Sequence, residues 1–332
     1  MNLLALAWCG IIAFGIIMYV LLGGFDLGIG IMSIFFRKEE ERDLLISTIL
    51  PVWDGNQTWL VFGGAALYGA FPLAFSEILP IMYIPILLMV ISLLFRGIAF
   101  EFRLKAIKTK PLWDYCFFIG SIFAVIAQGL ILGTFVQGFT IQPTSELSNF
   151  HEWLNPFGIG CALGLISGYS LLGANYLIIK TTGNLQEKCF SISSKMQYII
   201  LLGFIMVSVW SPFLDPAIME RWLNLKNMPF LAILPFITLI LFFLHRYAIK
   251  NKLEHAPFWC VIGMFLMCYI GFIISIYPYI VPRKITYLEA AADRSSLLFM
   301  LIGACIMLPP LLYYTYHSYK IFSGKVTKKL GY

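Results

Sequence analysis

The chain has 332 residues, of which 60% are hydrophobic and 12% charged, with a net charge of +6 and a mean hydropathy of +0.85. Soluble domains carry about a quarter charged residues, so this composition excludes a soluble globular protein, a disordered chain and a nucleic-acid-binding protein. It predicts an all-α polytopic membrane protein. In such a protein the positions of Lys and Arg first of all indicate which loops face the cytoplasm, and they are weaker evidence of a binding partner.

Nine stretches are apolar and long enough to cross a bilayer, which takes about 20 helical residues. In chain order these predicted spans are residues 7–35, 50–74, 78–100, 114–139, 156–179, 196–214, 229–249, 257–281 and 295–322. The first contains no Lys or Arg before Arg37, so we interpret it as a retained membrane helix and not as a cleaved secretory signal.

The distribution of the basic residues predicts the orientation of these spans. With the N-terminus outside, 18 of the 23 Lys and Arg residues fall on the cytoplasmic side, and five fall on the outer side. The outer five are Arg221, Lys226, Arg283, Lys284 and Arg294. The positive-inside rule therefore predicts an outer N-terminus, a cytoplasmic C-terminus and an odd number of spans.

The first predicted span contains an acid, Asp26, within the sequence GGFDLGIG. This residue lies about 10 residues, or ~15 Å, from the inner end of the span, near the midplane of the bilayer. Gly24 and Gly28 form a small-xxx-small pair that lets another helix approach closely, so we expect Asp26 to face protein. Proton handling and cofactor-site support are the functional interpretations; a structural hydrogen bond between two helices is the alternative.

The second span begins with a polar sequence, PVWDGNQTW, at residues 51–59. Asp54, Gln57 and Thr58 are spaced three and four residues apart, so they share a helix face one to two turns inside the membrane. Such a face is suited to holding a short file of water. Trp59 lies too deep for an interfacial belt, which favours a packing or channel-lining role.

The end of the third span carries an arginine, Arg96, in the apolar sequence LLFRGIAFEFR. A guanidinium in this setting needs an acid nearby, and Asp26, Glu101 and Asp114 are the candidate partners. The basic residues that follow suit simple snorkelling toward the cytoplasm. They are Arg103, Lys105 and Lys108.

The acids of the first half also form a predicted ladder for protons. Glu101 and Asp114 stand at the cytoplasmic mouth, Asp54 lies one to two turns inside, and Asp26 lies near the middle. A transporter that couples protons to solute movement is the competing interpretation, and it would show helices broken at matching positions of two halves. Only Pro309 and Pro310 are judged to fall mid-span, without a counterpart in the first half. A purely structural subunit is the third class considered.

The sequence contains no recognisable motif for haem ligation, for a metal site or for a catalytic nucleophile. The four histidines, His151, His245, His255 and His317, are expected in loops or near helix ends, away from the midplane. No two of the seven cysteines form a CxxC pair. We therefore expect no catalytic residue, no metal site and no tightly self-ligated haem in this chain.

One internal similarity links the two halves. The sequences YVLLGGFDL, beginning at Tyr19, and YSLLGANYL, beginning at Tyr169, agree at five of nine positions, 150 residues apart. Duplication of a four-helix unit, with one helix added, and coincidence between two Leu/Gly-rich helices both explain this agreement. If duplication is correct, the second copy has Tyr176 in place of Asp26.

Five segments together resemble subunit II of the cytochrome bd-type quinol oxidases, in its short, cyanide-insensitive-like bacterial form. They are GGFDLGIGIM, PVWDGNQTWL, FRGIAFEFR, PLWDY and YPYIVP, and the resemblance spans essentially the whole chain. It implies a first four-helix bundle at residues 1–140 with the acidic cluster, a second at 141–281, and a peripheral ninth helix with a cytoplasmic tail at 282–332. It also implies a bacterial plasma (inner) membrane location.

The resemblance implies a complex that oxidises quinol and reduces oxygen to water, with no nucleic-acid partner. Subunit I would bind two b-type haems and one d-type haem, and the family leaves room for a structural quinone and a small third subunit. Matched residue by residue, the proton-path candidates are Asp54, Asp26, Glu101, Asn56 and Gln57. Trp59 is the oxygen-path candidate, and Asp26, Arg96 and Asp114 are the candidates for haem-site support. Gly23 and Arg283 stand where many relatives have Asp and Pro.

Overall fold

The computed structural model describes residues 2–139, 150–224 and 227–326, most of which are helical. The first half contains α1 (Asn2–Met32), the short 3-10 helix η1 (Ser33–Phe35), α2 (Glu39–Ile49), α3 (Trp53–Ala70), α4 (Pro72–Lys105) and α5 (Lys110–Gln137). The second half contains α6 (Phe150–Trp153), α7 (Pro156–Lys180), α8 (Gly183–Leu214), α9 (Pro216–Leu223), α10 (Met228–Leu231), α11 (Ile233–Lys250) and α12 (Ala256–Ile276). A small antiparallel hairpin, β1 (Tyr279–Val281) and β2 (Ile285–Thr286), precedes α13 (Arg294–Ile321).

Within the described residues, eight helices are long and apolar enough to cross a membrane, which confirms a multi-span membrane protein. The predicted span at 50–74 is not among these eight. It corresponds to α3, whose 18 residues begin with the polar run Trp53–Trp59, and this run lowers the hydropathy of the whole helix. Nine spans therefore remain a prediction that depends on α3.

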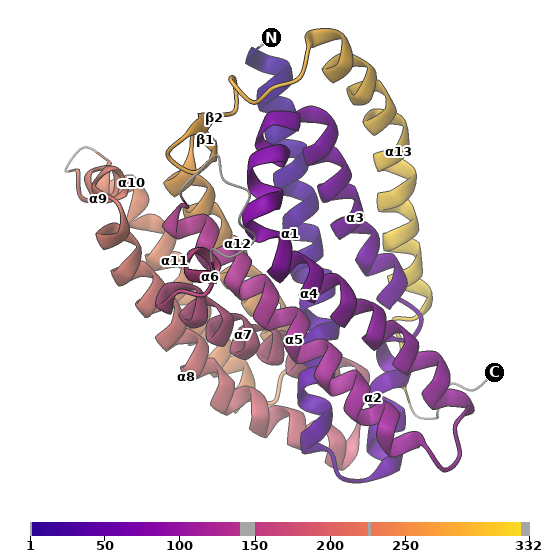
Figure 1. Ribbon diagram of the computed structural model, residues 1–332. Helices are drawn as coiled ribbons and strands as arrows, with labels where there is room; N and C mark the ends of the chain where they lie inside the picture. The colour runs from indigo at the N-terminus through magenta and orange to yellow at the C-terminus, as the bar shows by residue number, and fades with distance from the viewer. Residues whose placement is uncertain (1, 140–149, 225–226, 327–332) are drawn as a thin grey trace.

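Helix α1 occupies the middle of the molecule, with α5 and α7 packed along it and α3 covering another side (Figure 1). Helix α4 packs along α5, α8 along α7, and α11 along α12. Helix α13 lies at the edge, against α3 and α1 (Figure 1). The largest group of buried apolar side chains lies where these helices meet around α1 and α7. The boundary between two four-helix bundles at residues 140 and 141 lies outside the described residues.

The two ends of the helical body differ in the elements that cover them. The hairpin lies at the end that carries the N-terminus, and α2 lies at the opposite end, which we call the α2 end (Figure 1). Helix α2 was not predicted, because its 11 residues are too short and too polar for a span. The hairpin replaces the last residues of the predicted span at 257–281, since α12 already ends at Ile276.

Prolines lie inside several of the long helices without ending them. Pro80 and Pro85 lie inside α4, Pro212 inside α8, and Pro309 and Pro310 inside α13. The prediction that prolines occur at mid-span only in the last helix is therefore wrong, because α4 also contains Pro80 and Pro85. Each of these helices continues through its prolines, so none shows the unwound midpoint that a transporter site would use.

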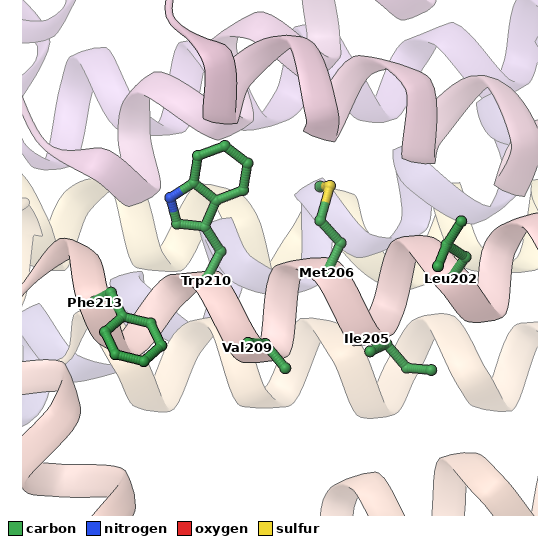
Figure 2. A pocket seen from close by; sticks show the side chains of 6 residues that line it. All are labelled: Leu202, Ile205, Met206, Val209, Trp210 and Phe213. Atoms are coloured by element: carbon green, nitrogen blue, oxygen red, sulfur yellow. The ribbon is translucent and has the colours of Figure 1, made fainter.

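An apolar groove runs along α8 on the surface of the helical body (Figure 2). Its lining side chains are Leu202, Ile205, Met206, Val209, Trp210 and Phe213. Large exposed side chains of this kind would be unfavourable in water, but they suit a helix that faces lipid tails. The groove therefore agrees with a membrane-embedded α8.

Candidate functional site: a buried acid–arginine cluster

Asp26 in α1 and Arg96 in α4 form an ion pair in the interior of the protein. Arg96 Nη2 lies 3.0 Å from Asp26 Oδ1, and the two side chains are 1% and 0% exposed. The guanidinium also lies over the rings of Phe100 and Phe117, 5.1 and 5.7 Å from their centroids. A charge at this depth is costly unless it is paired, so the pair stabilises both partners. Of the three acids expected as partners of Arg96, the structure selects Asp26.

A close contact between α1 and α7 covers the other side of Asp26. A Cβ atom on Gly28 would lie 1.7 Å from the carbonyl oxygen of Tyr169, and one on Gly24 would lie 2.6 Å from the Tyr169 ring. Only glycine leaves room for α7 at these two positions. The predicted seam of small residues is confirmed, and Asp26 faces protein as expected.

Asn56 in α3 is the third member of this buried cluster. Its Nδ2 donates to Asp26 Oδ2 at 3.2 Å and to the carbonyl oxygen of Leu22 at 3.1 Å. Its Oδ1 accepts a hydrogen bond from the hydroxyl of Tyr319 in α13 at 2.8 Å. The sequence singled out Asn56 but not Tyr319, because 263 residues separate the two and no local pattern links them.

A second face of α3 carries polar groups, and some of them have no hydrogen-bond partner among the described residues. Asp54 and Thr58 are exposed and Gln57 is half-buried, so the predicted shared face is confirmed. The side-chain nitrogen and oxygen of Gln57 and the indole nitrogen of Trp59 are buried without a hydrogen-bond partner among the described residues. Trp59 is 0% exposed and packs edge-on against Phe14, 5.7 Å away. Packing is therefore one role of Trp59, as predicted.

Arg103 in α4 is fully buried and does not snorkel, so that interpretation was wrong. Its Nε lies 2.5 Å from Asp114 Oδ1, and its Nη1 lies 2.5 Å from Asp43 Oδ1 in α2. Arg42 Nε lies 3.1 Å from the other oxygen of Asp114. Helix α2 folds over the end of α4 and supplies two of these charges, which a sequence without a predicted α2 could not reveal. We call Arg42, Asp43, Arg103 and Asp114 the α2 clamp.

Replacement of Arg103 by Gln is expected to loosen the α2 clamp. Asp43 and Asp114 would lose the guanidinium that lies between them, although Arg42 stays beside Asp114, and breaking a buried pair costs about 3–5 kcal/mol. We expect a lower thermal unfolding temperature and faster proteolytic cleavage within α2. Lys105→Gln, at an exposed position of the same helix, is the control and should leave both unchanged. If both variants had the same unfolding temperature and the same rate of cleavage within α2, the α2 clamp would not stabilise this end of the protein.

A further ion pair holds the start of α2 outside the spans. Lys110 Nζ lies 2.5 Å from Glu39 Oε1, and this contact holds the pKa of the Glu39 carboxyl below its ordinary value. A carboxyl with a lowered pKa favours the folded state above its unfolded pKa and loses this contribution as the pH falls through the folded one. The contact therefore weakens in acid.

The predicted ladder of acids is arranged differently from the expectation. Asp114 is held in the α2 clamp with Arg103 and Arg42, and Asp26 is paired with Arg96. Glu101 is exposed at the end of α4, with no ion pair to the described residues. Trp53 packs on Phe100, 5.2 Å between ring centroids, so the start of α3 lies beside the end of α4. Asp54 and Glu101 therefore lie at the same end of the molecule, the α2 end.

A histidine in the second half is buried in a polar cluster of its own. His245 is 0% exposed; its Nε2 lies 3.0 Å from Asn175 Nδ2, and its Nδ1 lies 3.1 Å from Gln197 Oε1. Both ring nitrogens are engaged, so this histidine does not fit the role of a haem ligand. His255 and His317 are exposed near the ends of their helices.

The two similar sequence segments, which begin at Tyr19 in α1 and at Tyr169 in α7, lie side by side in the structure. Gln128 in α5 donates from Nε2 to the hydroxyl of Tyr19 at 2.7 Å and accepts at Oε1 from the hydroxyl of Tyr169 at 3.0 Å. Phe25 stacks on Tyr176 with ring centroids 4.2 Å apart. Tyr19 and Tyr169 are equivalent residues of the two segments and share Gln128 as their partner, whereas Phe25 and Tyr176 are not equivalent positions. Duplication and coincidence therefore both remain explanations of the similarity.

Comparisons with known proteins connect this arrangement to one family. The model of the family described as cytochrome bd terminal oxidase subunit II matches residues 4–322. The chain is 27% identical to cytochrome bd-I ubiquinol oxidase subunit 2 of Escherichia coli (strain K12), over 99% of this chain and 96% of that protein. It is 28% identical to cytochrome bd ubiquinol oxidase subunit 2 of Bacillus subtilis (strain 168), over 97% and 96%. A chain in the structure of bd oxidase from Geobacillus thermodenitrificans has the same fold, with a TM-score of 0.81, 15% identity and coverage of 97% and 99%.

Proposed function

Because the chain belongs to the cytochrome bd terminal oxidase subunit II family, we propose that it pairs with a haem-bearing subunit I in a quinol oxidase. The complex oxidises quinol, passes the electrons to oxygen and forms water. The haems, two of b type and one of d type, are held mainly by subunit I. A structural quinone and a small third subunit are further partners that this assignment allows. The transporter interpretation is set aside, because the family is one of oxidases.

The polar face of α3 is the observation that carries this proposal. Asp54 is exposed, and within the described part of the chain it has no ion pair. Next to it, the amide atoms of Gln57 and the indole nitrogen of Trp59 are buried without partners. Lipid tails offer no hydrogen bonds to such groups, whereas water or a partner subunit does. This face therefore suits the contact with subunit I and a path for protons.

In this proposal protons enter from the cytoplasm at the α2 end, near Glu101 and Asp54. Gln57 holds water one turn further in, while Asn56 and Asp26 form the inner, buried part of the path. The N-terminus then lies outside and the C-terminus in the cytoplasm of a bacterial plasma membrane. The predominance of Lys and Arg in the loops at this end supports that orientation.

Trp59 and the buried charges have separate roles in the same proposal. Trp59 lies among apolar rings, and such surroundings suit the passage of oxygen better than that of protons. Asp26 and Arg96 support the haem site of subunit I through a fixed, neutral pair. Asp114 supports it indirectly, because the α2 clamp holds the end of α4, the helix that carries Arg96.

Replacement of Asp54 by Asn in the assembled complex tests this function. We expect a loss of oxygen-reducing turnover of about a hundredfold or more, the scale of a missing proton-transfer group, with unchanged haem absorption spectra. Asp293→Asn, at an exposed position at the opposite end of the protein, is the matched control and should retain full turnover. Normal turnover in the Asp54→Asn complex would assign this face a structural role only.

A further inference from the structure

The hydroxyl of Tyr319 reaches the buried acid cluster from the last helix of the chain. Tyr319 lies near the end of α13, and its hydroxyl is 2.8 Å from Asn56 Oδ1. Asn56 in turn contacts Asp26. None of the roles proposed above uses Tyr319, although it is the residue through which α13 contacts this cluster by a hydrogen bond.

The chemistry of the partners fixes which way the amide of Asn56 points. The carbonyl oxygen of Leu22 only accepts hydrogen bonds, and so does an ionised Asp26, so the Asn56 nitrogen must face both. The Asn56 oxygen then points to Tyr319, whose hydroxyl must donate. Tyr319 therefore supplies, among the described residues, the donor that the amide oxygen meets in this orientation.

The end of α13 is held in place by contacts on both sides of Tyr319. Its ring meets the Phe25 ring edge-on at 6.3 Å. Beyond it, Lys180 Nζ donates to the carbonyl oxygen of Phe322, and the Val326 nitrogen donates to the carbonyl oxygen of Lys180 at 2.8 Å. These contacts tie the end of α13 to the end of α7, so the hydroxyl is held where Asn56 needs it.

A second contact secures the same segment outside the spans. Lys325 Nζ lies 2.6 Å from Glu254 Oε1, and Gln186 Nε2 donates to the same oxygen at 2.7 Å. The Lys325 contact, followed by that of Gln186, lowers the pKa of the Glu254 carboxyl below its ordinary value. The segment after α13 is thus attached to the residues between α11 and α12.

We infer that Tyr319 is a positioning residue for Asp26 and acts through the amide of Asn56. When its hydroxyl donates to Asn56, the amide nitrogen is directed at Asp26 Oδ2, and Asp26 Oδ1 stays beside Arg96. Without the hydroxyl, the amide is held only through its nitrogen, by Leu22 and Asp26 itself, so its contact with Asp26 Oδ2 is less firmly fixed. The effect on turnover rests on the proposed function of Asp26, whereas the effect on the Asp26 carboxyl does not.

Tyr319→Phe in the complete oxidase complex tests this inference, with Tyr316→Phe as the control. Tyr316 lies one turn away in α13 and is 62% exposed. In Tyr319→Phe we expect the infrared band of the Asp26 carboxyl to shift, with the band identified by its loss in Asp26→Asn. Turnover should fall about fivefold, as for one lost hydrogen bond, with an unchanged KM for quinol. Tyr316→Phe should change neither.

Combination with Asn56→Ala separates positioning from a general loss of stability. If Tyr319 acts through Asn56, adding Tyr319→Phe to Asn56→Ala causes no further loss of turnover and no further band shift. Additive losses, or an unshifted Asp26 band in Tyr319→Phe, would overturn the inference. The band shift decides the question even where the double variant does not assemble.

The same experiments distinguish failure of the inference from failure of the proposed function. Normal turnover in Asp26→Asn together with a shifted band in Tyr319→Phe would refute the role of Asp26 and leave the positioning by Tyr319 supported. Impaired turnover in Asp26→Asn together with an unshifted band in Tyr319→Phe would refute the positioning alone.

Discussion

Replacement of Arg96 by Gln is expected to destabilise the protein by about 3–5 kcal/mol, because it leaves the Asp26 carboxylate buried without its cation. The pair lies at 3.0 Å and is almost fully enclosed, so water does not replace the lost partner. In the assembled complex we also expect altered haem absorption spectra, because this pair is proposed to support the haem site. Thermal unfolding of the purified complex and its reduced-minus-oxidised spectrum measure the two effects.

A double variant and a matched arginine make this prediction specific. Asp26→Asn combined with Arg96→Gln removes both charges and should recover most of the stability lost in Arg96→Gln alone. Arg246→Gln removes an exposed arginine of α11 and should leave the unfolding temperature and spectra unchanged. If Arg96→Gln behaved like Arg246→Gln, the ion pair would have no energetic or functional importance.

Replacement of Gly28 by Ala is expected to separate α1 from α7. The added Cβ would lie 1.7 Å from a backbone oxygen of α7, which cannot rotate away as a side chain would. Overpacking of a tight contact costs about 1–3 kcal/mol, and the backbone position places this variant at the upper end or beyond it. We expect less assembled complex and a lower unfolding temperature, with a weakened Asp26 site as a consequence.

Gly10 provides the matched control in the same helix. A Cβ on Gly10 has no atom of the described residues within 4 Å, so Gly10→Ala adds a methyl group without a clash. We expect this variant to keep its unfolding temperature and yield. A Gly28→Ala variant as stable as Gly10→Ala would show that α1 and α7 do not approach as closely as described.

The long apolar helices and the burial of Asp26 against protein were readable from the sequence because both depend on local composition. Eight spans follow from hydropathy, and an acid amid glycines near the midplane stands out in any apolar helix. The spacing of Gly24 and Gly28 correctly predicted a close helix contact, although not that Tyr169 would form it. The family was identified from the motifs that surround these same residues, and the family comparison confirms it.

The partners of the charged residues could not be predicted in the same way. Arg96 had three candidate acids, and only the folded arrangement, in which α5 packs against both α4 and α1, decides among them. Arg103 was assigned to the surface because α2, which supplies Asp43, was not predicted as a helix. Tyr319 had no sequence signal, since its partner Asn56 lies 263 residues away. Long-range pairing of helices determines each of these contacts.

The hydrogen bond from Tyr319 in α13 to Asn56 can form only late in the synthesis of the chain. Asn56 follows Asp26 after 30 residues, whereas Tyr319 follows Asn56 only after another 263. At about 5–20 residues per second, ribosomes need roughly 2–6 s for the first interval and roughly 13–53 s for the second. The Asn56 amide that contacts the buried acid therefore stays without its Tyr319 donor while the following 263 residues are made. Membrane insertion of α13 completes the cluster by bringing the Tyr319 hydroxyl to Asn56.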